Sequence, residues 1–163
     1  MKRLLLIAFL GCMSFCMMCA QLPVGQLFLS MPDSLCPMLD MRQRVVLLEY
    51  VNQQLQDSVV NIYGGQSRVL AKTDNYICLE AAEGVTMEIL ADTSSFILIQ
   101  TACAPVCSSI VKRYIANWLF MEELRPDHET DFMKAVVVDG RIVWSDETPL
   151  LLDDEEKKHY QTP

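Results

Sequence analysis

The stretch NYICLEAAEGVTMEILADTSSFILIQT, residues 75–101, decides the fold of this chain. It contains three apolar runs, 75–81, 85–91 and 96–101, which are separated only by short polar loops. Parallel strands need a crossover of about a dozen residues or more, whereas antiparallel strands can be joined by a tight turn. The stretch therefore predicts three consecutive strands of an antiparallel meander.

The residue pattern within these runs indicates how the sheet is covered. Phe96-Ile97-Leu98-Ile99 is apolar on both faces, which indicates a central strand. The run 75–81 instead alternates, as is typical of a sheet with one covered side. Its two faces carry Ile77, Leu79 and Ala81 on one side and Tyr76, Cys78 and Glu80 on the other.

Working outward, similar runs extend the strand pattern in both directions. Further strands are expected at 68–73, 109–114 and 118–123, and a last hairpin is expected at 136–144. Asp139-Gly140 divides that hairpin. This dipeptide matches the two-residue primed turn, in which both central residues need positive φ and glycine is strongly preferred.

One long helix is expected before the sheet, after an apolar entry segment at 27–31 and a turn at 32–34. Asp40 is a capping residue with Gln43 three positions later, so the helix should run from there to about Gln56. One long helix packed on a multi-stranded antiparallel meander is an α+β fold. The apolar residues that recur at helical spacing are Met41, Val45, Leu48, Val51 or Asn52, and Leu55.

The first twenty residues have the composition of a cleavable signal peptide. Lys2 and Arg3 precede the apolar run 4–10, and small residues end at Ala20 before the polar Gln21. We therefore expect a signal peptide at 1–20 and a single α+β domain at 21–163, with a mobile tail from about residue 150. The apolar stretch is shorter than the roughly 20 residues of a bilayer span, so no transmembrane span is expected in the mature chain.

Export to the periplasm or the cell surface follows from this leader. A lipoprotein is the alternative, but a modified cysteine should follow a small residue, and only Cys12, after Gly11, comes close to that pattern. The chain has 13 basic and 21 acidic residues, and removing Lys2 and Arg3 leaves 11 - 21, a formal net charge of -10. A negative surface repels phosphate backbones and anionic lipids, so nucleic acid is not an expected partner.

Four cysteines remain after the leader: Cys36, Cys78, Cys103 and Cys107. An oxidising compartment permits disulfides, and four cysteines allow three full pairings that the sequence leaves open. Cys103-Ala-Pro-Val-Cys107 is a possible disulfide. A turn centred on the proline could bring the two Cα atoms within the about 4.4–6.8 Å that such a bond needs, whereas an extended segment could not.

Reactive chemistry is not indicated by the motifs. A thiol-disulfide protein using Cys103 and Cys107 stays an alternative, although redox pairs have a two-residue spacer before a helix N-terminus. A carboxylate-based hydrolase is a second alternative, since the acids offer many pairs. Neither His128 nor His159 belongs to a zinc-ligand or nucleophile motif. We therefore assign no catalytic residue, no cofactor and no metal site.

The chain also resembles a domain-of-unknown-function family of exported Bacteroidales proteins, over most of its mature length. The family has no assigned activity, so the resemblance implies a compartment and a fold but no site residues. The matching positions are Met31-Pro32-Asp33-Ser34-Leu35 leading to Arg42, Asn61 with Gly64-Gly65 and Ser67, Thr73-Asp74-Asn75-Tyr76, and Thr101 with Pro105, Ser108-Ser109 and Trp118.

The expected function is that of a non-catalytic binding or interaction module of the periplasm or cell surface. Its partner would be an unknown protein, peptide or glycan of the cell envelope. The predicted binding surface is one face of the sheet, because exposed apolar side chains gathered on a face mark an interaction site. The residues expected on that face, mixed with charges, are Tyr76, Leu90, Phe96 and Leu98.

Overall fold

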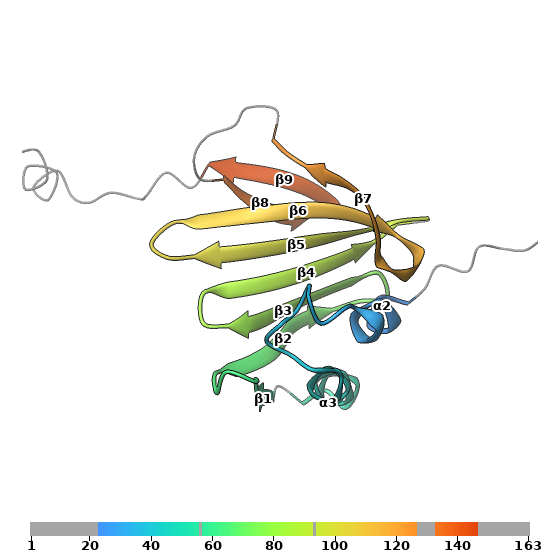
Figure 1. The fold of residues 1–163 in the computed structure, drawn as a ribbon, viewed down its shortest axis with the longest axis vertical. Coiled ribbons are helices and arrows are strands. Elements are labelled where there is room, and N and C mark those ends of the chain that lie inside the picture. Colours follow the sequence, from blue (N-terminus) through green and yellow to red (C-terminus); the bar gives the residue numbers. More distant parts are fainter. Residues whose placement is uncertain (1–22, 56, 93, 127–132, 147–163) are drawn as a thin grey trace, which may run out of the picture.

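The computed structural model describes residues 23–146 except 56, 93 and 127–132. The predicted signal peptide at 1–20, the tail from about 150, and both histidines lie outside the described residues. Within these limits the chain is α+β, with antiparallel strands and two short helices (Figure 1). No helix among the described residues is long and apolar enough to cross a membrane.

The predicted meander is confirmed and has one more strand than expected. Within the described residues, seven antiparallel strands lie side by side in chain order, β1 to β7. β1 was not predicted, because its three residues follow directly on polar loop sequence. The strands are β1 (Ser58–Val60), β2 (Gln66–Lys72), β3 (Tyr76–Ala82), β4 (Val85–Ala91), β5 (Phe96–Cys103), β6 (Cys107–Ile115) and β7 (Leu119–Leu124).

The last hairpin forms a separate two-stranded sheet of β8 (Met133–Val138) and β9 (Arg141–Asp146). Its turn is the predicted one, since Asp139 has φ 49° and Gly140 has φ 72°. Both values lie in the left-handed region that the primed turn requires.

The prediction of one long helix is wrong. The described residues instead form two shorter α-helices, α2 (Val24–Ser30, 7 residues) and α3 (Met41–Asn52, 12 residues). α2 lacks a side-chain cap and contains Gly25, so its local sequence predicts a helix poorly. It buries Val24, Leu27 and Phe28, and this packing rather than propensity stabilises it.

The buried face of α3 also differs from the prediction. The capping box between Asp40 and Gln43 is confirmed, with both of its hydrogen bonds at 2.8 Å. However, Met41 is 59% exposed, and the residues that α3 buries are Arg44, Leu47 and Leu48. The helix is therefore rotated relative to the predicted apolar stripe.

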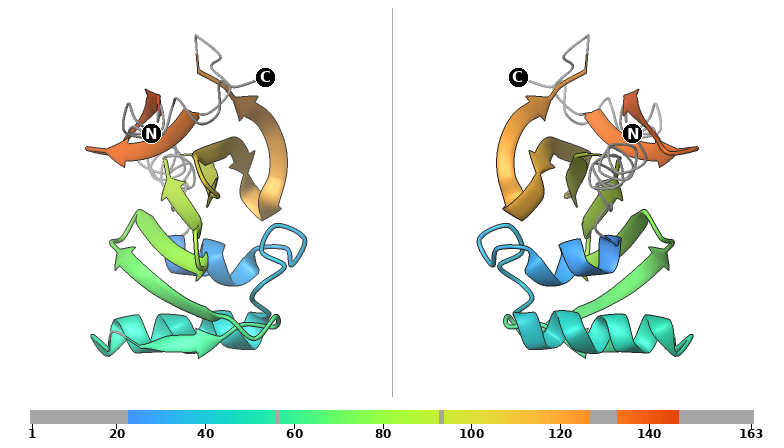
Figure 2. Two further views of the ribbon diagram at one scale, coloured as in Figure 1. Left: turned by 90° about the vertical axis from the view of Figure 1, so that its left-hand side faces the viewer. Right: turned by 90° about the vertical axis from the view of Figure 1, so that its right-hand side faces the viewer.

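The two helices cover one face of the sheet, and Figure 2 shows the sheet curving around α2. α2 packs on β3 and β4, while α3 packs on β1 and β2. The main core lies between these layers. Its fully buried members from the sheet include Ile77, Leu79, Ile89 and Leu98.

A buried arginine joins α3 to the end of α2. Arg44 is 1% exposed, and its guanidinium donates to the backbone oxygens of Phe28 and Met31 and to the carboxylate of Asp33. Its Nε donates to the Asp40 carbonyl at 3.4 Å. These bonds satisfy carbonyls at the C-terminal end of α2 that have no partner inside the helix.

Replacing this arginine with methionine should destabilise the fold, because Arg44→Met keeps most of the apolar stem but removes the donor to the carbonyls of Phe28 and Met31. Each buried unpaired group costs about 1–3 kcal/mol. We expect the free energy of unfolding, measured in urea by circular dichroism, to fall by about 2–5 kcal/mol. Arg42→Met, at an exposed position of the same helix, should change it by less than about 0.5 kcal/mol. Equal losses in the two variants would contradict the role of Arg44.

Candidate functional site

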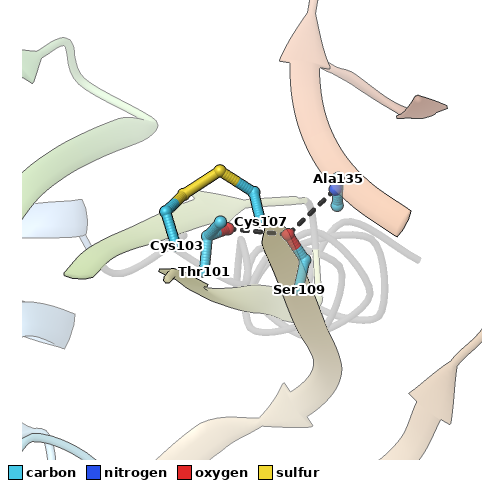
Figure 3. The surroundings of a disulfide bond; sticks show 5 residues. All are labelled: Thr101, Cys103, Cys107, Ser109 and Ala135. Atoms are coloured by element: carbon cyan, nitrogen blue, oxygen red, sulfur yellow. Dashed lines mark hydrogen bonds between the residues drawn. A yellow bond between two sulfur atoms is a disulfide. The ribbon is translucent and has the colours of Figure 1, made fainter. Parts of the chain in front are cut away.

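The structure joins Cys103 and Cys107 in a disulfide at the end of the β5–β6 hairpin (Figure 3). The two residues are direct partners in the register of β5 and β6, and their Cα atoms are 3.9 Å apart. The turn that the sequence argument required is therefore present, and it brings the two Cα atoms closer than the range that the argument used. Cys36 and Cys78 remain free cysteines.

The surroundings of this disulfide favour a structural role. Both cysteines belong to strands, and within the described residues no helix begins at either of them. A redox-active pair needs a helix N-terminus or a neighbouring cation to stabilise the thiolate. A further hydrogen bond fixes the backbone beside the disulfide, because the N–H of Cys103 donates to the Gly84 carbonyl at 2.8 Å.

Ser109, two residues after Cys107, connects the β8–β9 hairpin to the main sheet through hydrogen bonds. Its hydroxyl accepts a 2.9 Å hydrogen bond from the backbone N–H of Ala135 and lies 2.7 Å from the Thr101 hydroxyl. Figure 3 shows these contacts running from the disulfide-closed hairpin to β8. Ala135 is 1% exposed, so its N–H depends on this acceptor.

The hairpin covers the face of β5 and β6 that points away from the helices. Ile99, Val111 and Ala135 form a second, smaller core there, and Trp144 packs against it. The prediction that Phe96–Ile99 is apolar on both faces is thus confirmed, because Phe96 and Leu98 belong to the main core while Ile99 belongs to the second.

The predicted binding face does not exist as one surface. Tyr76 and Leu90 are cross-strand partners on the face away from the helices. Phe96 and Leu98 are instead 3% and 1% exposed in the main core. The error has a simple cause, since the sequence does not say which of two apolar faces a central strand turns toward the helices.

Tyr76, Cys78 and Glu88 lie together on that outer face. The Tyr76 hydroxyl donates to the Glu88 carboxylate, and burial, followed by this hydrogen bond, raises the pKa of Tyr76 above its ordinary value. Burial, followed by the charge of Glu88, raises the pKa of the Cys78 thiol from 9.0 to about 11. A thiol with a raised pKa is a poor nucleophile at neutral pH.

These contacts do not assemble a hydrolytic or metal site. Glu88 faces a phenol rather than the second carboxylate that a two-acid mechanism requires. Over the part of the chain that the structure describes, no three His, Cys, Asp or Glu side chains gather closely enough to hold a metal ion.

The feature that stands out instead is β7, at one edge of the seven-stranded sheet. Leu119, Phe120 and Met121 are 62%, 53% and 51% exposed, although large apolar side chains are usually covered. β7 pairs with β6 on one side, and no described strand pairs with its other side. Sequence reasoning placed this strand at 118–123 but had no signal for its position at the edge.

A small groove adjoins the far end of β7. It has a volume of about 250 Å³ and lies between the start of β6, the end of β7 and the β8–β9 hairpin. Two glutamates of β7 form ion pairs beside this groove. Glu122 lies 3.1 Å from Arg113, and Glu123 lies 3.2 Å from Arg125. The groove walls include Ser109, Ile110, Leu124, Met133 and Trp144. We call β7 and this groove together the edge site.

Comparison with known proteins agrees with this fold. A family model described as a protein of unknown function, DUF3256, matches residues 17–144. A solved domain of an uncharacterized protein from Porphyromonas gingivalis W83 is similar at 20% sequence identity, with a TM-score of 0.50. The similarity covers 61% of this chain and 53% of that chain, so it spans about half the length of that structure and shows the fold alone. No curated protein matches.

Removing the Ser109 hydroxyl should loosen the hairpin, because Ser109→Ala leaves the buried N–H of Ala135 without an acceptor at a cost of about 1–3 kcal/mol. We expect faster amide hydrogen exchange in β8 and β9, with the strands β2 to β4 unchanged. Ser108→Ala is the matched control, since Ser108 is exposed and adjacent. If both variants exchange alike, Ser109 does not hold the hairpin.

The raised pKa of Cys78 predicts a pH profile. Iodoacetamide should alkylate Cys78 of the folded chain slowly at about pH 8 and progressively faster toward pH 11, because only the thiolate reacts. In the chain unfolded in urea the pKa should return to 9.0. Since the folded-state pKa is the higher one, this group stabilises the fold fully below pH 9.0 and loses that contribution as the pH rises to about 11.

Peptide mass mapping separates the alkylation of Cys78 from that of the buried Cys36. A folded-state rate profile with the same midpoint as the unfolded one would be incompatible with the environment described for Cys78.

Proposed function

The chain belongs to the DUF3256 family, which is described as of unknown function, and we propose that it binds an extended peptide segment along edge strand β7. It does so as an exported, non-catalytic module of the periplasm or cell surface. The resemblance to a Bacteroidales family of unknown function is confirmed. The family has no activity to transfer, so the proposal rests on the edge site and on the leader at 1–20.

One observation carries the proposal, namely that β7 combines an open edge with exposed apolar side chains. An edge strand presents unpaired N–H and C=O groups that can pair with another chain, and proteins usually protect such edges with charges or prolines. The first half of β7, Leu-Phe-Met at 119–121, carries neither. Adding a strand to such an edge is a common way of recognising an extended peptide, since main-chain hydrogen bonds supply affinity and side-chain contacts supply specificity.

The groove lies at one end of β7 and offers a place for a side chain of the bound segment. A segment laid along β7 passes Leu119 to Met121 first and reaches the groove beside Leu124. The wall there includes Met133 and Trp144; methionine adapts to apolar groups of a partner, and tryptophan is enriched at interfaces. The bound segment therefore has apolar side chains along its length and one that fills the groove.

Charge further narrows the class of partner. The mature chain has a formal net charge of 11 - 21, or -10, which steers cationic partners toward it and repels nucleic acid. A glycan would use few of the backbone groups at the edge, whereas a peptide strand pairs with them along its whole length. We therefore place an extended peptide with flanking basic residues at the edge site.

Selection of random heptapeptides displayed on phage, with the immobilised mature chain as target, tests this function. The recovered peptides should be extended, apolar and basic, and should protect the amides of β7 from hydrogen exchange. Met121→Lys puts a charge on the edge and should weaken these peptides by about tenfold or more. Val138→Lys, at a 50% exposed position on β8, should leave affinity unchanged.

Equal affinity of both variants, or protection confined to another part of the sheet, would rule out the edge site. Both variants are checked by thermal unfolding first, so that a folding defect is not mistaken for lost binding.

A further inference from the structure

A cavity of about 490 Å³ lies beside β2 and β3, toward the edge of the seven-stranded sheet that is opposite β7. Its walls come from the start of α2, from α3 and from the turn between β2 and β3, which Figure 1 shows close together. Volumes of about 300–1,000 Å³ are typical of small-molecule sites. The lining used below consists of Gly25, Leu29, Leu48, Lys72 and Asp74.

Lys72 occupies an unusual position in this cavity, because its place in the sheet directs it toward the helices. It is the cross-strand partner of Ile77, whose side chain is 0% exposed in the main core. Directly opposed residues of an antiparallel pair share one face of the sheet. The lysine stem lies over α2, since its Cε is 3.8 Å from the point where a side chain on Gly25 would begin.

The ammonium group of Lys72 has no carboxylate partner in the described part of the chain. By contrast, Arg44, Arg68, Arg113 and Arg125 each lie within ion-pair distance of a carboxylate. Asp74 lines the same cavity but is exposed, so water screens its charge more strongly than that of the half-buried Lys72. A partly buried cation gains from an anion that also fills the neighbouring apolar space.

We infer that this cavity binds a small amphipathic anion, a carboxylate attached to an unbranched apolar chain. The carboxylate pairs with the Lys72 ammonium, and the chain lies against Leu29 and Leu48. The inference is independent of the peptide function, because β2 and β7 are separated by four strands of the sheet.

Octanoate is a suitable probe, and its binding to the mature chain is measured by isothermal titration calorimetry. We expect saturable binding at one site per chain. Octylamine, which has the opposite charge on a similar chain, should bind at least about tenfold more weakly, a difference of about 1.4 kcal/mol. Lys72→Met should weaken octanoate by a similar factor, while Lys72→Arg keeps the charge and should retain most of the affinity.

Two further variants localise the site. Gly25→Met directs a flexible side chain from α2 toward Leu48 and Lys72 and should abolish octanoate binding by filling the cavity. Gly25→Ala is its matched control, because the added Cβ meets its nearest neighbour, Leu48, at an ordinary contact distance of 3.6 Å. Lys112→Met, on β6, should leave octanoate affinity unchanged.

Absence of octanoate binding, equal binding of octylamine, or unchanged affinity in Lys72→Met would each overturn the inference. If Gly25→Met fails to fold, the comparison of Lys72→Met with Lys72→Arg still decides the outcome. The peptide selection at β7 is read separately, so either proposal can fail without the other.

Discussion

The buried guanidinium of Arg44 is the interaction on which the helical layer depends. It reaches from the first turn of α3 to the carbonyls at the end of α2, so the position of each helix sets that of the other. A buried arginine needs several acceptors, and the end of a helix offers unpaired carbonyls. Asp33 completes the set from the segment that joins the helices. Because both helices must meet here, α3 turns Leu47 and Leu48 rather than Met41 toward the sheet.

In the main sheet each strand pairs with the strands that precede and follow it in the sequence. At the end of the β5–β6 hairpin, the Cys103–Cys107 disulfide and the Ser109 hydroxyl hold the chain and the β8–β9 hairpin in place. The hairpin covers the outer face of β5 and β6 but, in the described residues, pairs with no edge of the main sheet. Consequently, within the described residues, β7 keeps an open edge next to a covered face, and the proposed peptide binding rests on this edge.

The two proposed sites use different physical features of one framework. At β7 the main contribution is backbone pairing, which accepts many sequences and is tuned by exposed apolar side chains. At Lys72 it is a single half-buried cation beside apolar walls, which selects a small ligand by charge. Both features are places where a local rule is broken: apolar residues are left exposed on a strand, and a lysine is turned toward the helices. Such departures are expected at functional positions, because elsewhere local pattern and packing agree.

Local sequence determined the strands other than β1, the start of α3 and the Asp139-Gly140 turn, because alternation, capping and primed-turn residues are properties of consecutive positions. The strand pattern at 75–101, the capping box at Asp40 and the Asp139-Gly140 turn were therefore predictable. The proximity of Cys103 and Cys107 needed only a local turn. Tertiary structure alone decided the helix α2, the buried face of α3 and the exposure of β7. The reason is physical: helix packing, the partners of Arg44 and the coverage of a sheet depend on groups that are distant in the sequence, and no local pattern contains them.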